Sequence, residues 1–329
     1  MPIFCSGRRK GKMNVFGPVP SRRLGKSLGI NNIPAKICTY SCVYCQIGRS
    51  LKMVGEREEY YSPQMLFAEI KDKVKRAREH NESIDYLTFV PDGEPTLDKS
   101  IGELIEMLKP LDIKVAVITN ASLIDLPDVR DDLFKADWVS LKVDTVDEAI
   151  WRKIDRPHRK LRLDSILKGI KIFAGEFEGH LATETMLVRD LNDRLENIRD
   201  VAGFIKELNV STAYIGVPTR PPAEKWVLPP EESALNTAYH IFVEDQIYVE
   251  YLIGYEGNQF AFTGDVEEDI LSTTAVHPMR EDALNALLEK ADSDFSLVER
   301  LVAEGKIVVS EYGGNRYYLR RLTLKDADR

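Results

Sequence analysis

Residues 84–143 contain three short apolar segments, 84–90 (IDYLTFV), 113–118 (IKVAVI) and 138–143 (WVSLKV). A stretch with helical periodicity, 97–108, lies between the first two. Apolar strands of about five residues that alternate with helices are typical of right-handed βαβ units. Because such connections place neighbouring strands side by side, this region predicts a parallel sheet.

The same alternation extends on both sides of this region. Ser62-Pro63 is typical of a helix start, with Ser62 as the N-cap and proline at the first helical position. The further predicted elements are helices at 65–79, 163–173 and 195–208 and strands at 181–188 and 213–217. About six units fit before Pro221, which predicts an α/β fold with a partial (β/α)6 TIM-like barrel that binds ligands at the C-terminal ends of its strands. An open doubly wound sheet is the alternative.

Prolines break this alternation after residue 217, and the remaining chain has a different pattern. A helix at 231–243 and a strand at 247–253 are followed by helices at 280–290 and 296–304. Residues 306–311 and 315–319 then predict a hairpin around Gly313-Gly314, so the end of the chain predicts a winged helix. We expect a basic segment at 1–25, the barrel at 26–222, a Pro/Gly-containing extension at 223–274 and a winged-helix-like domain at 275–329.

Composition excludes several classes of protein. The 329 residues include four cysteines, which is too few for a disulfide scaffold, and no apolar run of about 18 residues that would span a membrane. The first residues lack the apolar core of a secretory signal, so we expect a cytoplasmic protein.

Charge is unevenly distributed along the chain. The formal net charge is −8, yet residues 1–55 contain ten Lys or Arg and no Asp or Glu. Such asymmetry is typical of a local anionic partner. For the basic cluster at 8–12, a solvent-exposed N-terminal arm that binds no partner is an equally good interpretation. Residues 275–329 hold nine basic and ten acidic residues, which disfavours DNA binding. We therefore expect this domain to pack near residues 251–252 and cover the mouth of the barrel.

Three cysteines, Cys38, Cys42 and Cys45, are clustered with the spacing C-x3-C-x2-C. A structural zinc site needs a fourth ligand, and no other Cys or His lies near in the sequence. A [4Fe–4S] cluster usually has four cysteine ligands, so three would leave one iron open to a small molecule. Cys5 is distant from this group, and we expect it to take no part in the site.

This cysteine spacing resembles the cluster motif of the radical SAM superfamily, in which the amino and carboxylate groups of S-adenosylmethionine (SAM) chelate the open iron. The resemblance implies that Tyr44, the aromatic residue before the third cysteine, packs near the adenine.

Three further segments resemble SAM-contact motifs, and each falls at the predicted C-terminal end of a strand. Residues 90–95 (VPDGEP) resemble a Gly-Gly-Glu-Pro sequence with Asp92 at the first glycine position, which implies that Gly93, Glu94 and Pro95 hold the methionine amino group. Residues 119–121 (TNA) resemble a Thr-Asn-Gly turn, and residues 140–144 (SLKVD) end the next strand. These segments imply SAM contacts by Asn120, Ser140, Lys142 and Asp144.

A more specific resemblance rests on residues 17–25 (GPVPSRRLG), 156–158 (RPH) and 218–224 (PTRPPAE). These segments resemble an uncharacterised branch of radical SAM Fe–S oxidoreductases that is similar to wyosine-type tRNA synthases. The cysteines for the second cluster of those synthases are absent. The resemblance implies reductive cleavage of SAM to a 5′-deoxyadenosyl radical that abstracts hydrogen from a substrate, with a reductant such as flavodoxin or ferredoxin.

The substrate is left open by the sequence. The residues that we consider for substrate binding are Arg22, Arg23, Arg156, His158, Glu184 and Arg220. For Arg22 and Arg23, ion pairs with acidic neighbours are as consistent with the sequence as substrate binding. Glu184 is consistent with either a SAM ribose contact or a structural ion pair. The substrate classes in play are a small anion, a peptide or protein, and RNA. The alternative functions are an Fe–S redox sensor that uses the winged helix and a tRNA-modifying radical SAM enzyme.

Overall fold

The computed structural model describes residues 14–321, and its centre is a curved sheet of eight strands. Cys5 and the basic cluster at 8–12 lie outside these residues, as does the end of the predicted C-terminal domain after residue 321. The strand order is β1-β2-β5-β6-β7-β8-β9-β10. The bounds are β1 Val15–Ser21, β2 Gly25–Ile30, β5 Tyr86–Phe89, β6 Lys114–Thr119, β7 Trp138–Lys142, β8 His180–Met186, β9 Thr212–Gly216 and β10 Val249–Leu252.

All neighbouring strands from β2 to β10 are parallel, and β1 pairs antiparallel with β2. The sheet therefore contains seven parallel strands, more than the six units that the sequence predicts. β10 matches the strand predicted at 247–253 but falls within the extension expected at 223–274, and β2 has no counterpart among the predicted strands. β1 likewise comes from the segment at 1–25, and the division of the chain into domains stays a prediction.

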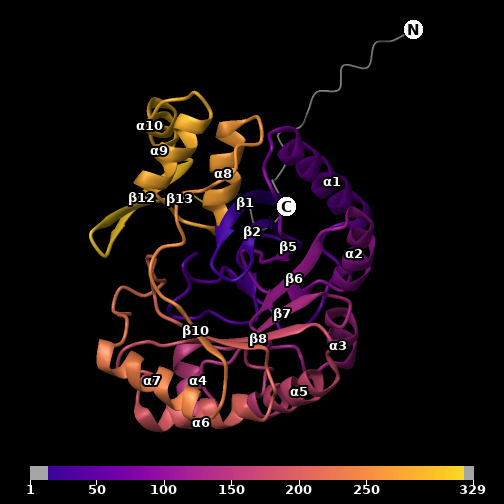
Figure 1. Cartoon of the computed structure of the whole chain (residues 1–329), viewed down its shortest axis with the longest axis vertical. Coiled ribbons are helices and arrows are strands. Elements are labelled where there is room, and N and C mark those ends of the chain that lie inside the picture. The colour runs from indigo at the N-terminus through magenta and orange to yellow at the C-terminus, as the bar shows by residue number, and fades with distance from the viewer. Residues whose placement is uncertain (1–13, 322–329) are drawn as a thin grey trace.

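Helices cover the outer side of this sheet (Figure 1). Their bounds are α1 Pro63–Glu79, α2 Ile101–Leu108, α3 Pro127–Leu133, α4 Glu148–Ile154, α5 Leu163–Glu176, α6 Leu195–Lys206 and α7 Glu232–Glu244, with short 3₁₀ turns at Pro95–Leu97 (η1) and Lys109–Leu111 (η2). α1 begins after Ser62, as its Ser-Pro pair predicts, although the Ser62 hydroxyl donates to the Gln64 side chain and caps no backbone group.

Side chains alternate between the two faces of the sheet, as the period of a strand requires. Leu87, Val117 and Val139 are fully buried in the core beneath the helices. Ala116 and Trp138 belong to a second cluster, which Leu24 from the β1–β2 turn completes. Two buried faces explain why these strands are continuous apolar runs in the sequence.

The remaining elements form a C-terminal unit of residues 266–321. It comprises α8 Val266–Val276, β11 Met279–Arg280, α9 Glu281–Lys290, α10 Ser296–Ala303, β12 Ile307–Tyr312 and β13 Asn315–Arg320. α9, α10 and the hairpin lie where the sequence predicts them, whereas α8 was not predicted. β13 is the central strand of a small sheet with β11 and β12.

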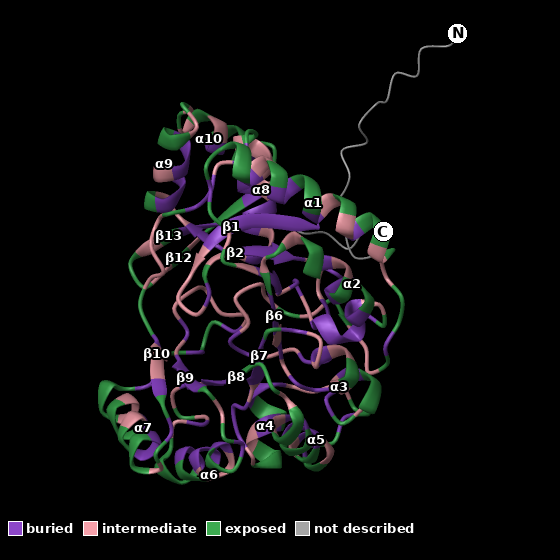
Figure 2. Cartoon of the chain, turned by 45° about the vertical axis from the view of Figure 1, so that its right-hand side comes forward, coloured by how far each residue is buried: buried purple, intermediate pink, exposed green. Residues whose placement is uncertain are grey.

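This C-terminal unit packs on β1 (Figures 1 and 2). Phe16 and Val19 of β1 share one buried cluster with Ile270 and Leu284 of the unit. We expected the unit near residues 251–252 of β10; it packs mainly on β1 at the other edge of the sheet, and Tyr255, just beyond β10, also lies against it. The reason is that β1 presents a second apolar face, which the prolines in its sequence conceal.

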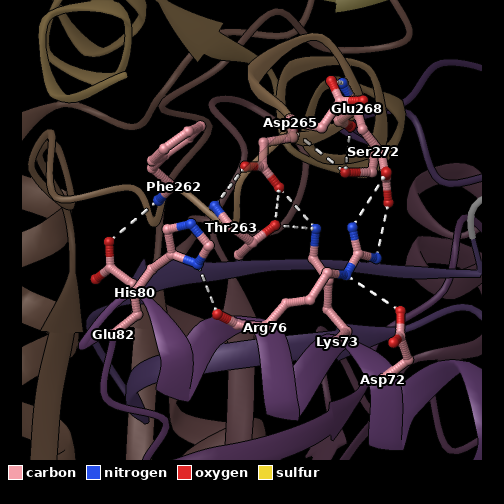
Figure 3. A network of polar contacts seen from close by, with 11 residues as sticks. Asp72, Lys73, Arg76, His80, Glu82, Phe262, Thr263, Asp265, Glu268 and Ser272 are labelled. Carbon is pink, nitrogen blue, oxygen red and sulfur yellow. Dashed lines mark hydrogen bonds and ion pairs between the residues drawn. The ribbon is translucent and has the colours of Figure 1, made fainter. Parts of the chain in front are cut away.

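A buried ion pair fastens the same unit to α1 (Figure 3). Lys73 Nζ donates to Asp269 Oδ1 at 2.6 Å and to Thr263 Oγ1 at 2.8 Å, and Arg76 donates two hydrogen bonds to Glu268. The Lys73 and Asp269 side chains are 2% and 3% exposed, so the contact is an internal one. Within residues 14–321, no helix combines the length and the apolar character that a bilayer crossing requires.

Candidate functional site

A cavity of about 270 Å³ lies at the carboxyl ends of the parallel strands. Residues at or just after the ends of β5, β6, β7, β8, β9 and β10 line it, together with the loop that follows β2. This is the end of a βα barrel at which ligands bind. The predicted residues that line the cavity are Arg22, Arg23, Cys38, Cys42, Tyr44, Cys45, Gly93, Glu94, Asn120, Lys142, Glu184 and Arg220.

The cysteine loop is held by backbone hydrogen bonds on two sides. β3 (Ile37–Cys38) pairs with β4 (Lys52–Met53), which closes the loop at its base. Val43 N donates to Ile154 O at 2.9 Å, which ties the middle of the loop to the end of α4. All three cysteines are free and face the cavity.

The three thiols suit a cluster that gives each sulfur its own iron. Burial raises the pKa of Cys38 to about 12 and that of Cys45 to about 11, and it raises the pKa of Cys42 well above its usual range. Thiolates therefore need a cationic metal centre here. In the part of the chain that the structure describes, no three His, Cys, Asp or Glu side chains converge on one metal ion. The thiols line one cavity instead, and in a [4Fe–4S] centre each cysteine binds a different iron.

Glu94 fastens the two turns that follow β5 and β6. Its Oε1 accepts from Thr96 Oγ1 and from Thr119 Oγ1, both at 2.6 Å, and its Oε2 accepts from Asn120 N at 2.8 Å. Burial raises the pKa of Glu94 even though these donors oppose the shift. Pro95 follows in η1, outside the cavity lining, and its carbonyl accepts from Asn32 Nδ2.

Gly93 and Ala121 have backbone geometries that explain their turns. A Cβ on Gly93, at φ +155°, would stand 1.9 Å from the carbonyl oxygen of Ile37 beside the first cysteine. Ala121 adopts φ +61°, the left-handed conformation that the glycine of a Thr-Asn-Gly turn takes readily. The side chain of Asn120 donates to Thr39 Oγ1 at 2.8 Å and approaches the Cys38 sulfur at 3.6 Å.

Two buried carboxylates meet at Tyr44. Its hydroxyl donates to Asp144 Oδ2 and lies 3.3 Å from Asp155 Oδ1, and the Cys42 sulfur also lies 3.3 Å from Asp155 Oδ1. Burial and the neighbouring Asp144 charge raise the pKa of Asp155 well above its usual range. Asp144 lies behind the cavity lining and accepts from Met186 N at 2.7 Å, so it fixes the ring of Tyr44 and the end of β8 together.

Lys142 and Glu184 place opposite charges on neighbouring strands. Glu184 Oε1 accepts from Ser140 Oγ at 2.8 Å, and its Oε2 accepts from Arg23 Nη1 at 2.9 Å. Burial alone would raise the pKa of Glu184, but Arg23 and then Lys142 leave it below its usual value. Ser140 lies outside the cavity lining and acts on the cavity through Glu184. Lys142 Nζ lies 5.2 Å from the centre of the Tyr44 ring.

Arg220 joins the cysteine loop to the C-terminal unit. Its guanidinium donates to Gln46, which follows the third cysteine, and to Glu256, and one of its nitrogens lies 3.1 Å from His277 Nε2. Gln46 Nε2 in turn donates to the Val276 carbonyl at 3.2 Å. The end of α8 therefore packs behind Gln46 and Arg220, two residues that line the cavity.

Arg156 and His158 lie outside the cavity lining. Arg156 pairs with Glu224, to which Arg49 also donates two hydrogen bonds. His158 N donates to Thr39 O at 2.8 Å, so this segment supports the cysteine loop from behind.

Sequence reasoning missed Asp155, Glu256 and His277. Asp155 directly precedes the Arg-Pro-His segment at 156–158. That segment points to this region of the chain, but it does not indicate that Asp155 contacts Tyr44 and Cys42. Glu256 lies just beyond β10, where ligand-facing residues of a barrel occur. Assigning residues 247–253 to the barrel would have identified it.

Comparisons with known proteins agree with this geometry. The family model described as "Radical SAM superfamily" matches residues 32–205. The chain is 47% identical over 313 residues to a UPF0026 protein of Methanocaldococcus jannaschii, covering 94% of this chain and 97% of that protein. It is 32% identical over 315 residues to a protein named GTPase Obg of Brachyspira hyodysenteriae, covering 93% of this chain and 45% of that protein.

Among solved structures, a radical SAM methyltransferase from Sphaerobacter thermophilus matches with a TM-score of 0.53 and 15% identity, over 69% of this chain and 67% of that chain. That likeness concerns the fold. The chain belongs to the radical SAM superfamily, and it is therefore an enzyme of a class that uses SAM and an iron–sulfur cluster.

Proposed function

We propose that this enzyme cleaves SAM reductively at a single [4Fe–4S] cluster held by Cys38, Cys42 and Cys45. The observation that carries the proposal is that all three thiols face one cavity together with the polar ends of the parallel strands. When bound, the cluster and SAM supply a 5′-deoxyadenosyl radical that removes a hydrogen atom from the substrate, and a flavodoxin or ferredoxin supplies the electron. The protein contributes binding, orientation and the exclusion of water.

The residues of the cavity divide into contact and positioning roles in this proposal. Tyr44, Gly93, Asn120 and Lys142 contact SAM, and Glu94 holds the turns that carry two of them. Pro95, Ser140 and Asp144 act through neighbours, because each lies outside the cavity lining. Arg22, Arg23, Glu184 and Arg220 face the remaining space and contact the substrate, whereas Arg156 and His158 support the cysteine loop.

We further propose that residues 275–321 form a winged helix that covers the cavity and binds no DNA. The hairpin is docked on the barrel, since Tyr312 Oη donates to Pro218 O at 3.1 Å and Tyr317 Oη donates to Thr219 O at 3.0 Å. The segment that would read DNA, α10, carries Glu299 and Arg300, and Arg300 is already paired with Glu267 and Glu304. Phosphate contacts dominate DNA affinity, and this helix offers no surplus of positive charge.

Anaerobic reconstitution tests the proposed chemistry. We expect about four irons per chain for a single cluster and almost none in a variant with all three cysteines changed to alanine. The reduced wild type should release 5′-deoxyadenosine from SAM, and the triple variant should not. Eight irons per chain, or iron retained in the variant, would contradict a single cluster on these residues.

A further inference from the structure

The β1–β2 turn brings two arginines into the wall of the cavity. β1 ends at Ser21 and β2 begins at Gly25, so Arg22 and Arg23 lie in the tight turn between them. Leu24, the next residue, is 3% exposed and is buried among side chains of the barrel interior. This anchor fixes the turn, and both arginines line the cavity.

Three donor atoms of these arginines are buried and lack an acceptor within residues 14–321. Arg22 Nη2 reaches Glu256 Oε1 at 3.3 Å, but its Nε and Nη1 have no hydrogen-bond partner, and neither has Nε of Arg23. Buried polar groups are almost always hydrogen-bonded, and a buried donor without an acceptor destabilises the fold. A site that retains such donors is suited to a ligand that supplies acceptors.

The charges around the turn leave a positive excess. Arg22, Arg23 and Arg220 are balanced by two carboxylates, Glu184 and Glu256. Glu184 is already bound by Arg23 and Ser140, and Glu256 is already bound by Arg220. The nearby His277 carries no negative charge that could offset the arginines. Among these five charged groups, one cation therefore remains uncompensated, and Arg22 has the longest of the three arginine–carboxylate contacts.

We propose that Arg22 forms a subsite for a carboxylate or phosphate group of the substrate. This inference rests on the proposed function, because it assigns a chemical class to the molecule that the radical attacks. A guanidinium binds both anions through charge-assisted hydrogen bonds, which are about twice as strong as neutral ones. Arg220 and Arg23 already bind the two neighbouring carboxylates, so an incoming anion is the group that would supply acceptors to the free donors.

The test measures anion binding to the reconstituted full chain, with inorganic phosphate and with acetate as separate probes at constant ionic strength. We expect one of the two anions to raise the melting temperature of the wild type. Arg22→Gln should lower the affinity for that anion at least about tenfold, since a charge-assisted hydrogen bond is lost. Stronger stabilisation by phosphate assigns a phosphate group, and stronger stabilisation by acetate assigns a carboxylate. The control is Arg152→Gln, an exposed arginine paired with Glu148 on α4, which should bind both probes as the wild type does.

Arg22→Met serves as a second variant that removes the charge but keeps an apolar stem. If Arg22 serves a ligand, this variant should be at least as stable as the wild type without anion, because Glu256 keeps its ion pair with Arg220 and two buried donors without an acceptor are removed. Equal binding of both probes to wild type and Arg22→Gln, or a marked loss of stability in Arg22→Met, would overturn the subsite. SAM cleavage by the wild type is scored separately. Its failure alongside intact anion binding contradicts the proposed function and leaves the anion site standing.

Discussion

Gly93 is the residue at which a single methyl group should damage the site most. A Cβ added there would lie 1.9 Å from Ile37 O and 2.8 Å from Ile33 Cδ1, and the first of these is backbone that cannot rotate away. We expect Gly93→Ala to lower the free energy of unfolding by about 3 kcal/mol, the upper range for forced overpacking. The variant should also retain less iron, because Ile37 directly precedes Cys38. Urea unfolding and iron analysis measure both effects.

The matched control for this change is Gly203→Ala. Gly203 lies inside α6, and no atom stands within 4 Å of its added Cβ. Alanine is favoured over glycine in a helix by up to about 1 kcal/mol, so this variant should be slightly more stable than the wild type. A Gly93→Ala protein with wild-type stability and iron content would show that the cysteine loop moves freely relative to β5.

For single residues, the sequence predicts the metal-binding cysteines better than it predicts the hydrogen bonds that hold the site in place. The spacing of Cys38, Cys42 and Cys45 is local, so it is visible without a fold. Glu94 is recognisable from its motif, but its hydrogen bonds to Thr119 and Asn120 depend on the pairing of two strands. Glu256 and His277 lie far from Arg220 in sequence, and no local pattern joins them.

Among the elements, the packing of α8 on α1 depends on the buried Lys73–Asp269 pair (Figure 3). We expect Lys73→Met to lower the free energy of unfolding by about 3–5 kcal/mol, because it leaves the Asp269 charge buried with only its bonds to Thr263. Changing both residues, as Lys73→Met with Asp269→Leu, should recover much of that loss. Urea unfolding and limited proteolysis of the C-terminal unit are the measurements.

Lys75→Met controls for the loss of a lysine on the same helix. The Lys75 side chain is 73% exposed and pairs with Glu79 on the surface, so its removal should change stability by less than about 0.5 kcal/mol. If Lys73→Met behaved like this control, the pair would contribute nothing to docking α8.

The sequence predicts some strands much better than others. Parallel strands such as β6 and β7 are buried on both faces, so each is a clear apolar run. β1 is obscured by Gly17, Pro18 and Pro20, which are typical of a loop. Proline is tolerated there because β1 is the edge strand, with a strand partner on one side. β10 was predicted as a strand, but the prolines before it concealed its place in the sheet.

For the whole molecule, we expect acid to loosen the contact between the barrel and the C-terminal unit at His277. Burial, followed by the positive charge of Arg220, lowers the pKa of His277 from 6.5 to about 3, although Glu256 opposes the shift. The unfolded chain takes up this proton near pH 6.5, and the folded chain does not until about pH 3. Stability conferred by the neutral imidazole is therefore present above about pH 6.5 and falls as the pH drops below it, by up to about 1.4 kcal/mol per unit.

The comparison of wild type with His277→Gln isolates this contribution. Glutamine can still accept a hydrogen bond from Arg220 but does not titrate. Urea unfolding at about pH 7 and about pH 5 should therefore show a smaller acid loss in the variant, by up to about 2 kcal/mol. An identical loss in both proteins would assign the acid sensitivity to carboxylates elsewhere.

The packing of β1 against the C-terminal unit also determines when the site is completed during synthesis. A ribosome delivers the chain from its N-terminus, so Arg22 and the three cysteines emerge long before Glu256 and His277 have been translated. Until α8 arrives, Phe16 and Val19 lack the apolar side chains that cover them, and Gln46 and Arg220 lack their contacts with Val276 and His277. A chain that ends before residue 266 lacks the contacts that hold Gln46 and Arg220 from behind, so the cavity reaches its final geometry only after α8 has been made.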